Sequence, residues 1–324
     1  MQYLKIEDEI GYFKKRYEIR KRIEDMFLSE GYVQIEPSIF EDYDMFEHVD
    51  KRLKKESLVK VIGGSSEVLI LRPDITTNII KNLIPRWQEG LKLKLFYNSS
   101  VYRNQEGVNI REIRQMGIEN LGEDSLKADK EIILLALKIL DSFDSRFILE
   151  MSNSKYINGL LKEMDVEENE KRHIKDLIYR KNRQELISYI GALNISKSIT
   201  DALANIMDLQ GSIESVKAKS RHYYMNDEMM EALDETKTIC KLIEEKGYKN
   251  NVQVDMSMVT ELDYYDGLIF KGYLPQSYKS IISGGRYDSF TRIFGKEVSA
   301  IGFSIDMDEL TDINYEEEQR SWII

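Results

Sequence analysis

Two polar segments in the C-terminal third of the chain carry residue types that could bind or transform a small ligand. Residues 262–267 read Leu-Asp-Tyr-Tyr-Asp-Gly and fall inside a run, 256–270, that predicts a β-strand. Residues 283–288 read Ser-Gly-Gly-Arg-Tyr-Asp and predict a glycine turn closed by charged side chains. Polar groups held on rigid strands beside such a turn are typical of a pocket for a small polar ligand. Thr260 and Glu261, just before the tyrosines, supply no cation for chemistry on an anion.

A third group of polar residues lies on a predicted strand in the first half of the chain. Alternation along residues 110–121 places Gln115, Gly117 and Glu119 on one face, and the glycine would leave room for a ligand between the two polar side chains. Arg103 ends the preceding strand and can pair with a carboxylate or phosphate. Taken alone, this alternation also fits a solvated, salt-bridged sheet face.

Composition and charge narrow the class of protein. The 324 residues are 42% hydrophobic and 32% charged, which is typical of a soluble globular protein with a substantial core. The net charge of −11 argues against a nucleic-acid-binding surface, and no apolar run approaches the roughly 20 residues that span a bilayer. A single cysteine, Cys240, and an N-terminus unlike a signal peptide predict a cytoplasmic protein. His48, His173 and His222 lack ligand-type spacing, so we expect no metal site.

Hydrophobic periodicity predicts an α+β fold in which an antiparallel sheet is flanked by helices. The expected helices cover residues 10–30, 74–82 and 128–143, and the expected strands cover 32–35, 58–62, 68–71, 91–103, 110–121, 146–151, 251–270, 280–283 and 301–305. From 154 to 247 the strand-like alternation stops and helical periods take over. We therefore expect a core formed by residues 1–153 and 248–324, with a helical insertion at 154–247.

Four segments together resemble histidyl-tRNA synthetase, a class II synthetase. They are Leu-Arg-Pro-Asp-Ile-Thr at 71–76, the run 101–119 that resembles motif 2, the Leu-Asp-Tyr-Tyr segment at 262–265, and the run 284–303 that resembles motif 3. Pro37 sits where this family has its motif 1 dimer contact. The resemblance covers roughly residues 5–150 and 250–312, and it implies a class II synthetase-like core assembled as a homodimer.

The resemblance also implies a histidine-binding site. Asp74, Thr76 and Gln115 would hold the α-amino group of histidine, while Glu119 and Tyr264 would contact its imidazole nitrogens. An ammonium group needs an anion and neutral acceptors, and a partly buried imidazole needs partners on both nitrogens. With Tyr265 shaping the pocket and Arg103 at its edge, the predicted histidine-binding residues are Asp74, Thr76, Arg103, Gln115, Glu119, Tyr264 and Tyr265.

Departures from the synthetase pattern argue against amino-acid activation. Thr260 stands in place of the family's arginine, Gln105 in place of a glutamate, and Glu309 in place of the motif 3 arginine that binds ATP phosphates. A carboxylate repels a triphosphate, and losing a positioned cation costs about 3–4 kcal/mol of transition-state stabilisation. We therefore expect no catalytic residues and no cofactor. The chain stops at Ile324, so we expect no anticodon-binding domain.

A synthetase-like core with a histidine pocket and without an ATP site is similar to the regulatory subunits of ATP phosphoribosyltransferase. That resemblance implies a cytoplasmic hetero-oligomer with the short-form catalytic subunit, which starts histidine biosynthesis and is inhibited by histidine. Two alternatives stay open: a truncated synthetase-like ligase acting on another acceptor, and a sensor module with an unrelated partner. The place of histidine binding is also open between the pocket and a subunit interface.

Overall fold

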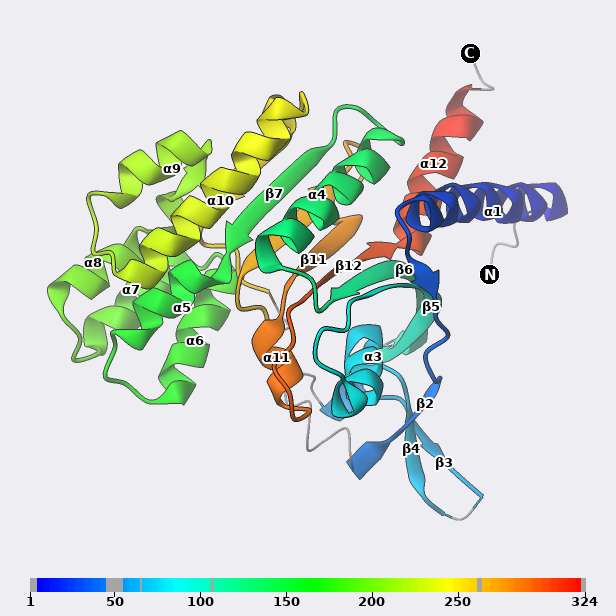
Figure 1. Ribbon diagram of the computed structural model, residues 1–324, viewed down its shortest axis with the longest axis horizontal. Helices are drawn as coiled ribbons and strands as arrows, with labels where there is room; N and C mark the ends of the chain where they lie inside the picture. Colours follow the sequence, from blue (N-terminus) through cyan, green and yellow to red (C-terminus); the bar gives the residue numbers. More distant parts are fainter. Residues whose placement is uncertain (1–4, 45–54, 65, 106–107, 261–263, 322–324) are drawn as a thin grey trace.

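The structure is a computed structural model that describes residues 5–44, 55–64, 66–105, 108–260 and 264–321. In these residues a large sheet runs through the centre, a smaller sheet projects from one end, and helices cover the large sheet (Figure 1). The predicted α+β class with helices flanking a sheet is confirmed. Within the described ranges no helix is long and apolar enough to cross a membrane.

The large sheet places the motif-bearing strands side by side. Its nine strands, counted over the described residues, follow the order β1-β5-β6-β12-β11-β10-β7-β9-β8. Their bounds are β1 Val33–Gln34, β5 Leu93–Gln105, β6 Val108–Leu121, β12 Ala300–Asp306, β11 Ile282–Arg286, β10 Leu268–Tyr273, β7 Ile148–Asn153, β9 Val252–Asp255 and β8 Gln210–Gly211. The central pairs are antiparallel as predicted, whereas β1–β5 and β7–β9 are parallel. Strands from both ends of the sequence therefore meet at β6–β12.

The smaller sheet contains the predicted hairpin. Strands β3 (Lys60–Ile62) and β4 (Val68–Leu71) pair antiparallel, and β2 (Phe40–Asp42) joins the other side of β4. The segment that carries Asp74 follows β4 directly, so the smaller sheet helps to position Asp74.

The helices outside residues 154–247 pack mainly on the large sheet. They are α1 Ile6–Ser29, α3 Ile75–Leu83, α4 Ser125–Asp141, α11 Asp288–Arg292 and α12 Met307–Ser321, with short 3-10 turns η1 Lys55–Ser57, η2 Ile84–Arg86 and η4 Lys249–Asn251. Helix α4 buries Ile132, Ala136 and Leu140 against the sheet (Figure 1). Helix α1 buries residues of its second half, among them Ile23 and Phe27. Its first half lies beside α12, and Ile10 and Phe13 there are about half exposed.

Residues 154–247 form a group of helices at one side of the large sheet (Figure 1). They are α5 Ser154–Lys162, α6 Glu168–Tyr179, α7 Arg183–Ala192, α8 Lys197–Ala204, α9 Ile213–Ser220 and α10 Asp227–Glu245, with the turn η3 Ile206–Asp208. Their buried residues, among them Leu160, Ile178 and Leu203, form a hydrophobic cluster, which we call the helical cluster. The segment also contributes the two-residue strand β8, which the sequence pattern did not indicate. Its status as a separate inserted domain stays a prediction.

The predicted strand at 251–270 is wrong in its middle. Strand β9 ends at Asp255 and β10 begins at Leu268, so Tyr264 and Tyr265 lie in a connecting loop. The apolar and aromatic residues of this run favour a strand, but tertiary packing decides otherwise. Met256 and Val259 pack in the helical cluster instead of continuing the sheet.

The predicted glycine turn at 283–288 is also wrong. Gly284 and Gly285 lie inside β11, between β10 and β12. A Cβ on Gly284 would overlap the carbonyl oxygen of Gly302, and one on Gly285 would approach the Tyr265 ring to 2.7 Å. These glycines allow close approach of neighbouring groups within a central strand.

Candidate functional site

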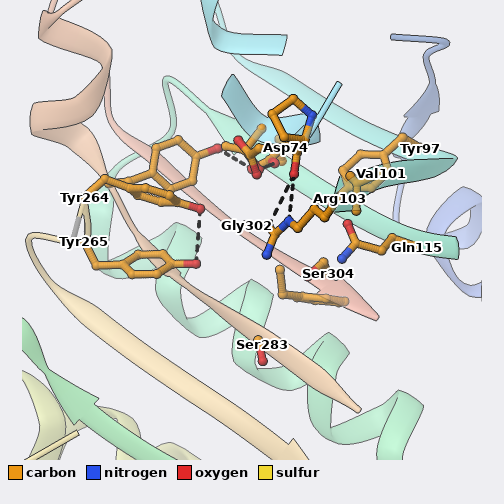
Figure 2. Close-up of a pocket in the computed structure, with 15 residues that line it drawn as sticks. Asp74, Tyr97, Val101, Arg103, Gln115, Tyr264, Tyr265, Ser283, Gly302 and Ser304 are labelled. Carbon is orange, nitrogen blue, oxygen red and sulfur yellow. Dashed lines mark hydrogen bonds between the residues drawn. The ribbon is translucent and has the colours of Figure 1, made fainter. Parts of the chain in front are cut away.

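A cavity of about 110 Å³ opens on one face of the large sheet, between α3 and the loop that follows β9. Figure 2 shows its lining side chains converging from several elements. The lining residues are Pro73, Asp74, Thr76, Tyr97, Val101, Arg103, Gln115, Glu119, Tyr264, Tyr265, Ser283, Tyr287, Gly302, Phe303 and Ser304. All seven residues predicted from the sequence line this one cavity.

Glu119 of β6 is the buried carboxyl group of the site. Its side chain accepts a hydrogen bond of 2.6 Å from the Thr76 hydroxyl and a second one from the Tyr287 hydroxyl. Burial raises the pKa of Glu119 to about 8, although both hydrogen bonds act in the opposite direction. Nearby Asp74 raises the pKa further. Because burial disfavours the ionised form, a ligand that donates an N–H or carries positive charge would favour ionisation.

Tyr264 and Tyr265 form one wall of the cavity, with their hydroxyl groups 3.4 Å apart and directed inward (Figure 2). The Tyr264 ring stacks on Phe290 at 5.1 Å between centroids and meets Tyr287 edge to face at 5.6 Å. Burial, with smaller effects of neighbouring acidic groups, holds the pKa of Tyr264 well above 10. This hydroxyl therefore stays neutral and can donate to an imidazole nitrogen.

Asp74 has two roles in this structure. It is the N-cap of α3, where its carboxylate accepts a 2.7 Å hydrogen bond from the backbone N–H of Thr77. It also lines the cavity (Figure 2). An acidic cap stabilises the helix N-terminus and still leaves oxygen lone pairs for a ligand ammonium.

Arg103 and Gln115 lie at the side of the cavity opposite the tyrosines (Figure 2). The Arg103 guanidinium donates two hydrogen bonds of 3.3 Å to the Pro73 carbonyl oxygen and makes no carboxylate ion pair within the described residues. The Gln115 side chain has no hydrogen-bond partner in the described part of the chain. A guanidinium group and an amide group, both with N–H donors still available, would therefore face a ligand from this side.

Two tyrosines that sequence reasoning missed complete the site. Tyr97 lies opposite Gly117 across the β5–β6 ladder, and a Cβ on Gly117 would overlap its hydroxyl and ring. The prediction that Gly117 leaves room for a ligand is therefore wrong, because the Tyr97 ring fills that space. Tyr287 follows β11 and belongs to the 283–288 segment, so its place in that motif was the available signal. Gly302, beside Glu119, stays small because a Cβ there would overlap the carboxyl group.

Several other residues of the motif segments lie outside the cavity. Arg286 is 5% exposed and forms a structural ion pair with Asp129 at 2.6 Å. Glu309, at the start of α12, does not line the cavity and instead accepts from Ser277 at 2.6 Å and pairs with Lys279 at 3.0 Å. Glu261, Leu262 and Asp263 lie outside the described residues. No group of three or more metal-ligating side chains is found in the described ranges.

Comparisons with known proteins agree with this architecture. The family model of histidyl-tRNA synthetase matches residues 11–310. An ATP phosphoribosyltransferase regulatory subunit from Clostridium botulinum is 31% identical over 301 residues, which are 91% of this chain and 71% of the relative. The chain belongs to the histidyl-tRNA synthetase-like family of ATP phosphoribosyltransferase regulatory subunits. The family resemblance and the class II synthetase-like fold expected from the sequence are thereby confirmed.

Solved structures of this family and its relatives share the fold. A Bacillus halodurans structure of an ATP phosphoribosyltransferase regulatory subunit/histidyl-tRNA synthetase superposes with a TM-score of 0.82 at 26% identity, covering 97% of this chain and 81% of that one. A chain of the ATP phosphoribosyl transferase (HisG:HisZ) complex from Thermotoga maritima has a TM-score of 0.68 at 19% identity, covering 90% and 97%. The second likeness concerns the fold alone.

In the regulatory-subunit fold, Asp74 allows helix capping to be separated from ligand binding. Asn caps a helix about as well as Asp, so Asp74→Asn is expected to leave the free energy of unfolding nearly unchanged, whereas Asp74→Ala should lower it by about 1 kcal/mol. Both variants should weaken binding of an ammonium-bearing ligand, because both remove the anion. Urea unfolding and calorimetric titration with histidine would check this. Wild-type affinity in Asp74→Asn would leave Asp74 as a helix cap only.

Proposed function

We propose that this chain is the regulatory subunit of an ATP phosphoribosyltransferase and that it binds free histidine in the cavity between Glu119 and Tyr264. The observation that carries the proposal is the convergence of all seven predicted histidine-binding residues on one cavity. Its volume, about 110 Å³, is small beside the roughly 300–1,000 Å³ of pockets for drug-sized ligands. A compact amino acid suits this space.

The chemistry of the cavity supports a defined orientation of histidine. Asp74, Thr76 and Gln115 would hold the α-amino group, and Glu119 and Tyr264 would contact the imidazole nitrogens. Arg103 would take the α-carboxylate, because its guanidinium is bonded only to a backbone carbonyl in the described residues. Tyr265 would close the wall. Each charged or polar group of the ligand then has a partner of complementary type.

We propose further that the chain does not activate histidine. Glu309 is tied to Lys279, and Thr260 supplies no charge, so the residues at these two positions offer a triphosphate no positioned cation. Control of a separate catalytic subunit fits this arrangement better. The likeness to the regulatory subunit from Clostridium botulinum supports an ATP phosphoribosyltransferase catalytic subunit as the partner. Histidine that binds one assembly state more tightly would inhibit the complex by feedback, with a coupling of about 1–3 kcal/mol.

A homodimer through the synthetase-like core is part of this proposal. Ile6, Ile10, Phe13 and Tyr17 on α1 recur at helical spacing and are 47–72% exposed. Pro37 follows β1, the next strand after this helix in the chain. An exposed apolar stripe of this kind suits burial against a second copy. Light scattering of the purified chain should give twice the monomer mass of 38.0 kDa.

Three measurements on the full chain test the function. Calorimetric titration should show histidine binding at one site per chain, and ATP–pyrophosphate exchange with histidine should be absent. Co-expression with a short-form catalytic subunit should yield a complex whose phosphoribosyltransferase activity requires this chain and falls when histidine is added. Robust pyrophosphate exchange would instead support the ligase alternative.

A further inference from the structure

The loop between β9 and β10 contacts two hydrophobic clusters. At its start, Met256 is fully buried and Val259 is partly buried, and both pack in the helical cluster. Near its end, Tyr264 and Tyr265 pack in a different cluster that surrounds the cavity and includes Phe290. The described start of this loop thus belongs to the helical cluster and its described end to the wall of the amino-acid pocket, while residues 261–263 between them lie outside the described residues.

A polar cluster pins the start of this loop to the helical segment. The ammonium group of Lys181, in the turn between α6 and α7, donates to the Asp255 carboxylate and to the Ser257 hydroxyl, each at 2.6 Å. The Asp255 carboxylate also accepts from the Ser257 backbone N–H at 2.8 Å and from its hydroxyl at 2.6 Å. Asp255 and Ser257 are 4% and 0% exposed, so Lys181 is the cation that reaches a buried pair of acceptors. We call these three residues the Lys181 clamp.

The backbone at Lys181 is unusual for a lysine. Its φ is +54°, and it follows the last turn of α6, where its N–H bonds to the Ile178 carbonyl and the Asn182 N–H bonds to the Leu177 carbonyl. This pattern is a Schellman ending, whose left-handed position glycine normally occupies. A lysine there has a less favourable backbone than glycine, so its side chain must contribute something that the helix end does not need.

The far end of the loop is held separately. The Asp266 backbone N–H donates to the Arg286 carbonyl at 3.0 Å, and its carboxylate accepts from the Asp288 N–H at 3.1 Å. Tyr264 and Tyr265 directly precede this anchor. The Lys181 clamp and this anchor thus hold the two described ends of the loop that carries the two tyrosines.

We propose that Lys181 is a positioning residue for the amino-acid pocket, linking the position of the helical segment to the placement of Tyr264 and Tyr265. The inference rests on the proposed function, because it treats these tyrosines as part of the histidine site. It goes beyond that function by naming a route from the helical segment to ligand affinity. Such a route is a physical coupling only if removing its contacts changes the distant site.

Lys181→Gly is the decisive variant, because glycine suits the left-handed backbone and removes only the side chain. In the full chain we expect its histidine affinity, measured by calorimetric titration, to fall by about 3-fold to 30-fold. Relief of the left-handed backbone offsets part of the destabilisation that comes from leaving the buried Asp255 carboxylate without its cation, so its melting temperature should lie above that of Lys181→Met. Lys181→Met should show the same loss of affinity, and Lys181→Arg should restore much of it. Lys217→Met is the matched control, since Lys217 pairs with Asp234 inside the helical segment.

Amide hydrogen exchange on the ligand-free chain gives a readout that does not depend on histidine binding. Peptides containing Tyr264 and Tyr265 should exchange faster in Lys181→Gly than in the wild type or in Lys217→Met. Unchanged exchange in these peptides, or wild-type histidine affinity in both Lys181→Gly and Lys181→Met, would overturn the proposal. If the wild type binds no histidine, the proposed function fails, and hydrogen exchange alone decides whether the coupling exists.

Discussion

Arg286→Met is expected to lower the free energy of unfolding by about 3–5 kcal/mol at pH 8, because it leaves buried carboxylates without their cation. Arg286 is 5% exposed and binds Asp129 at 2.6 Å and Asp288 at 2.9 Å. Its guanidinium also donates to the Ser125 carbonyl and the Ser299 hydroxyl. Urea unfolding followed by circular dichroism would measure the loss.

The loss should shrink at low pH. Burial raises the pKa of Asp129 to about 6 and also raises that of Asp288, although Arg286 opposes both shifts. A carboxyl whose pKa is raised in the folded state favours folding below its unfolded pKa, and this contribution is lost as pH rises through the folded pKa. Without Arg286 both carboxyls bind protons more readily, so the variant should recover stability between pH 8 and pH 5.

An exposed arginine provides a control that separates the effect of burial from the effect of removing a charge. Arg292 pairs with Glu297 at 2.6 Å, but both side chains are more than half exposed. Arg292→Met should therefore cost no more than about 1 kcal/mol at either pH. Equal losses in the two variants would show that the Arg286 network is not the buried structural element described above.

Glu119→Gln is expected to reduce histidine affinity about 10-fold to 100-fold at pH 8.5, because it removes the charged acceptor for an imidazole N–H. Glutamine keeps the shape and can still accept from Thr76. Glu119→Ala should lose at least as much affinity. Glu112→Gln is the control on the same strand: Glu112 occupies the alternate face of β6 and pairs with Arg114.

The pH dependence of binding tests the same carboxyl group. With the pKa of Glu119 raised to about 8, histidine binding at neutral pH should release a proton as the carboxyl ionises. Affinity should therefore rise as pH increases from about 6.5, where free imidazole becomes mainly neutral, to about 8. Titrations in buffers of different ionisation enthalpy would count the proton. A flat profile, or the same profile in Glu119→Gln, would contradict this role.

The sequence indicated which residues line the cavity better than it indicated their surroundings. Glu119, Thr76 and Tyr264 come from three separate segments, and they line one cavity because the motif order reflects a known fold. Tyr97 could not be found by simple strand counting. Extending the register outward from the Gln105–Val108 pair would place Phe96 opposite Gly117, but an irregularity between Arg103 and Gln105 shifts the register by one residue and brings Tyr97 there.

The wrong strand assignments have a related cause. Residues 256–267 have the composition of a strand, and only packing against the helical cluster directs their first part away from the sheet. Gly284 and Gly285 have the composition of a turn, and only the closeness of Gly302 and Tyr265 explains why glycine is needed inside β11. In both cases the deciding contacts join residues distant in sequence, which local patterns do not report.

The place of β12 in the sheet means that the sheet cannot be completed until this strand has been synthesised. Strand β12, residues Ala300–Asp306, lies between β6 and β11, so the middle of the described sheet is filled by a strand that is synthesised after its neighbours. Until it leaves the ribosome, the long β5–β6 hairpin presents an unpaired edge, which can pair with other chains. We expect the nascent protein to depend on chaperones until β12 has been made, and fragments ending before residue 300 to aggregate rather than fold.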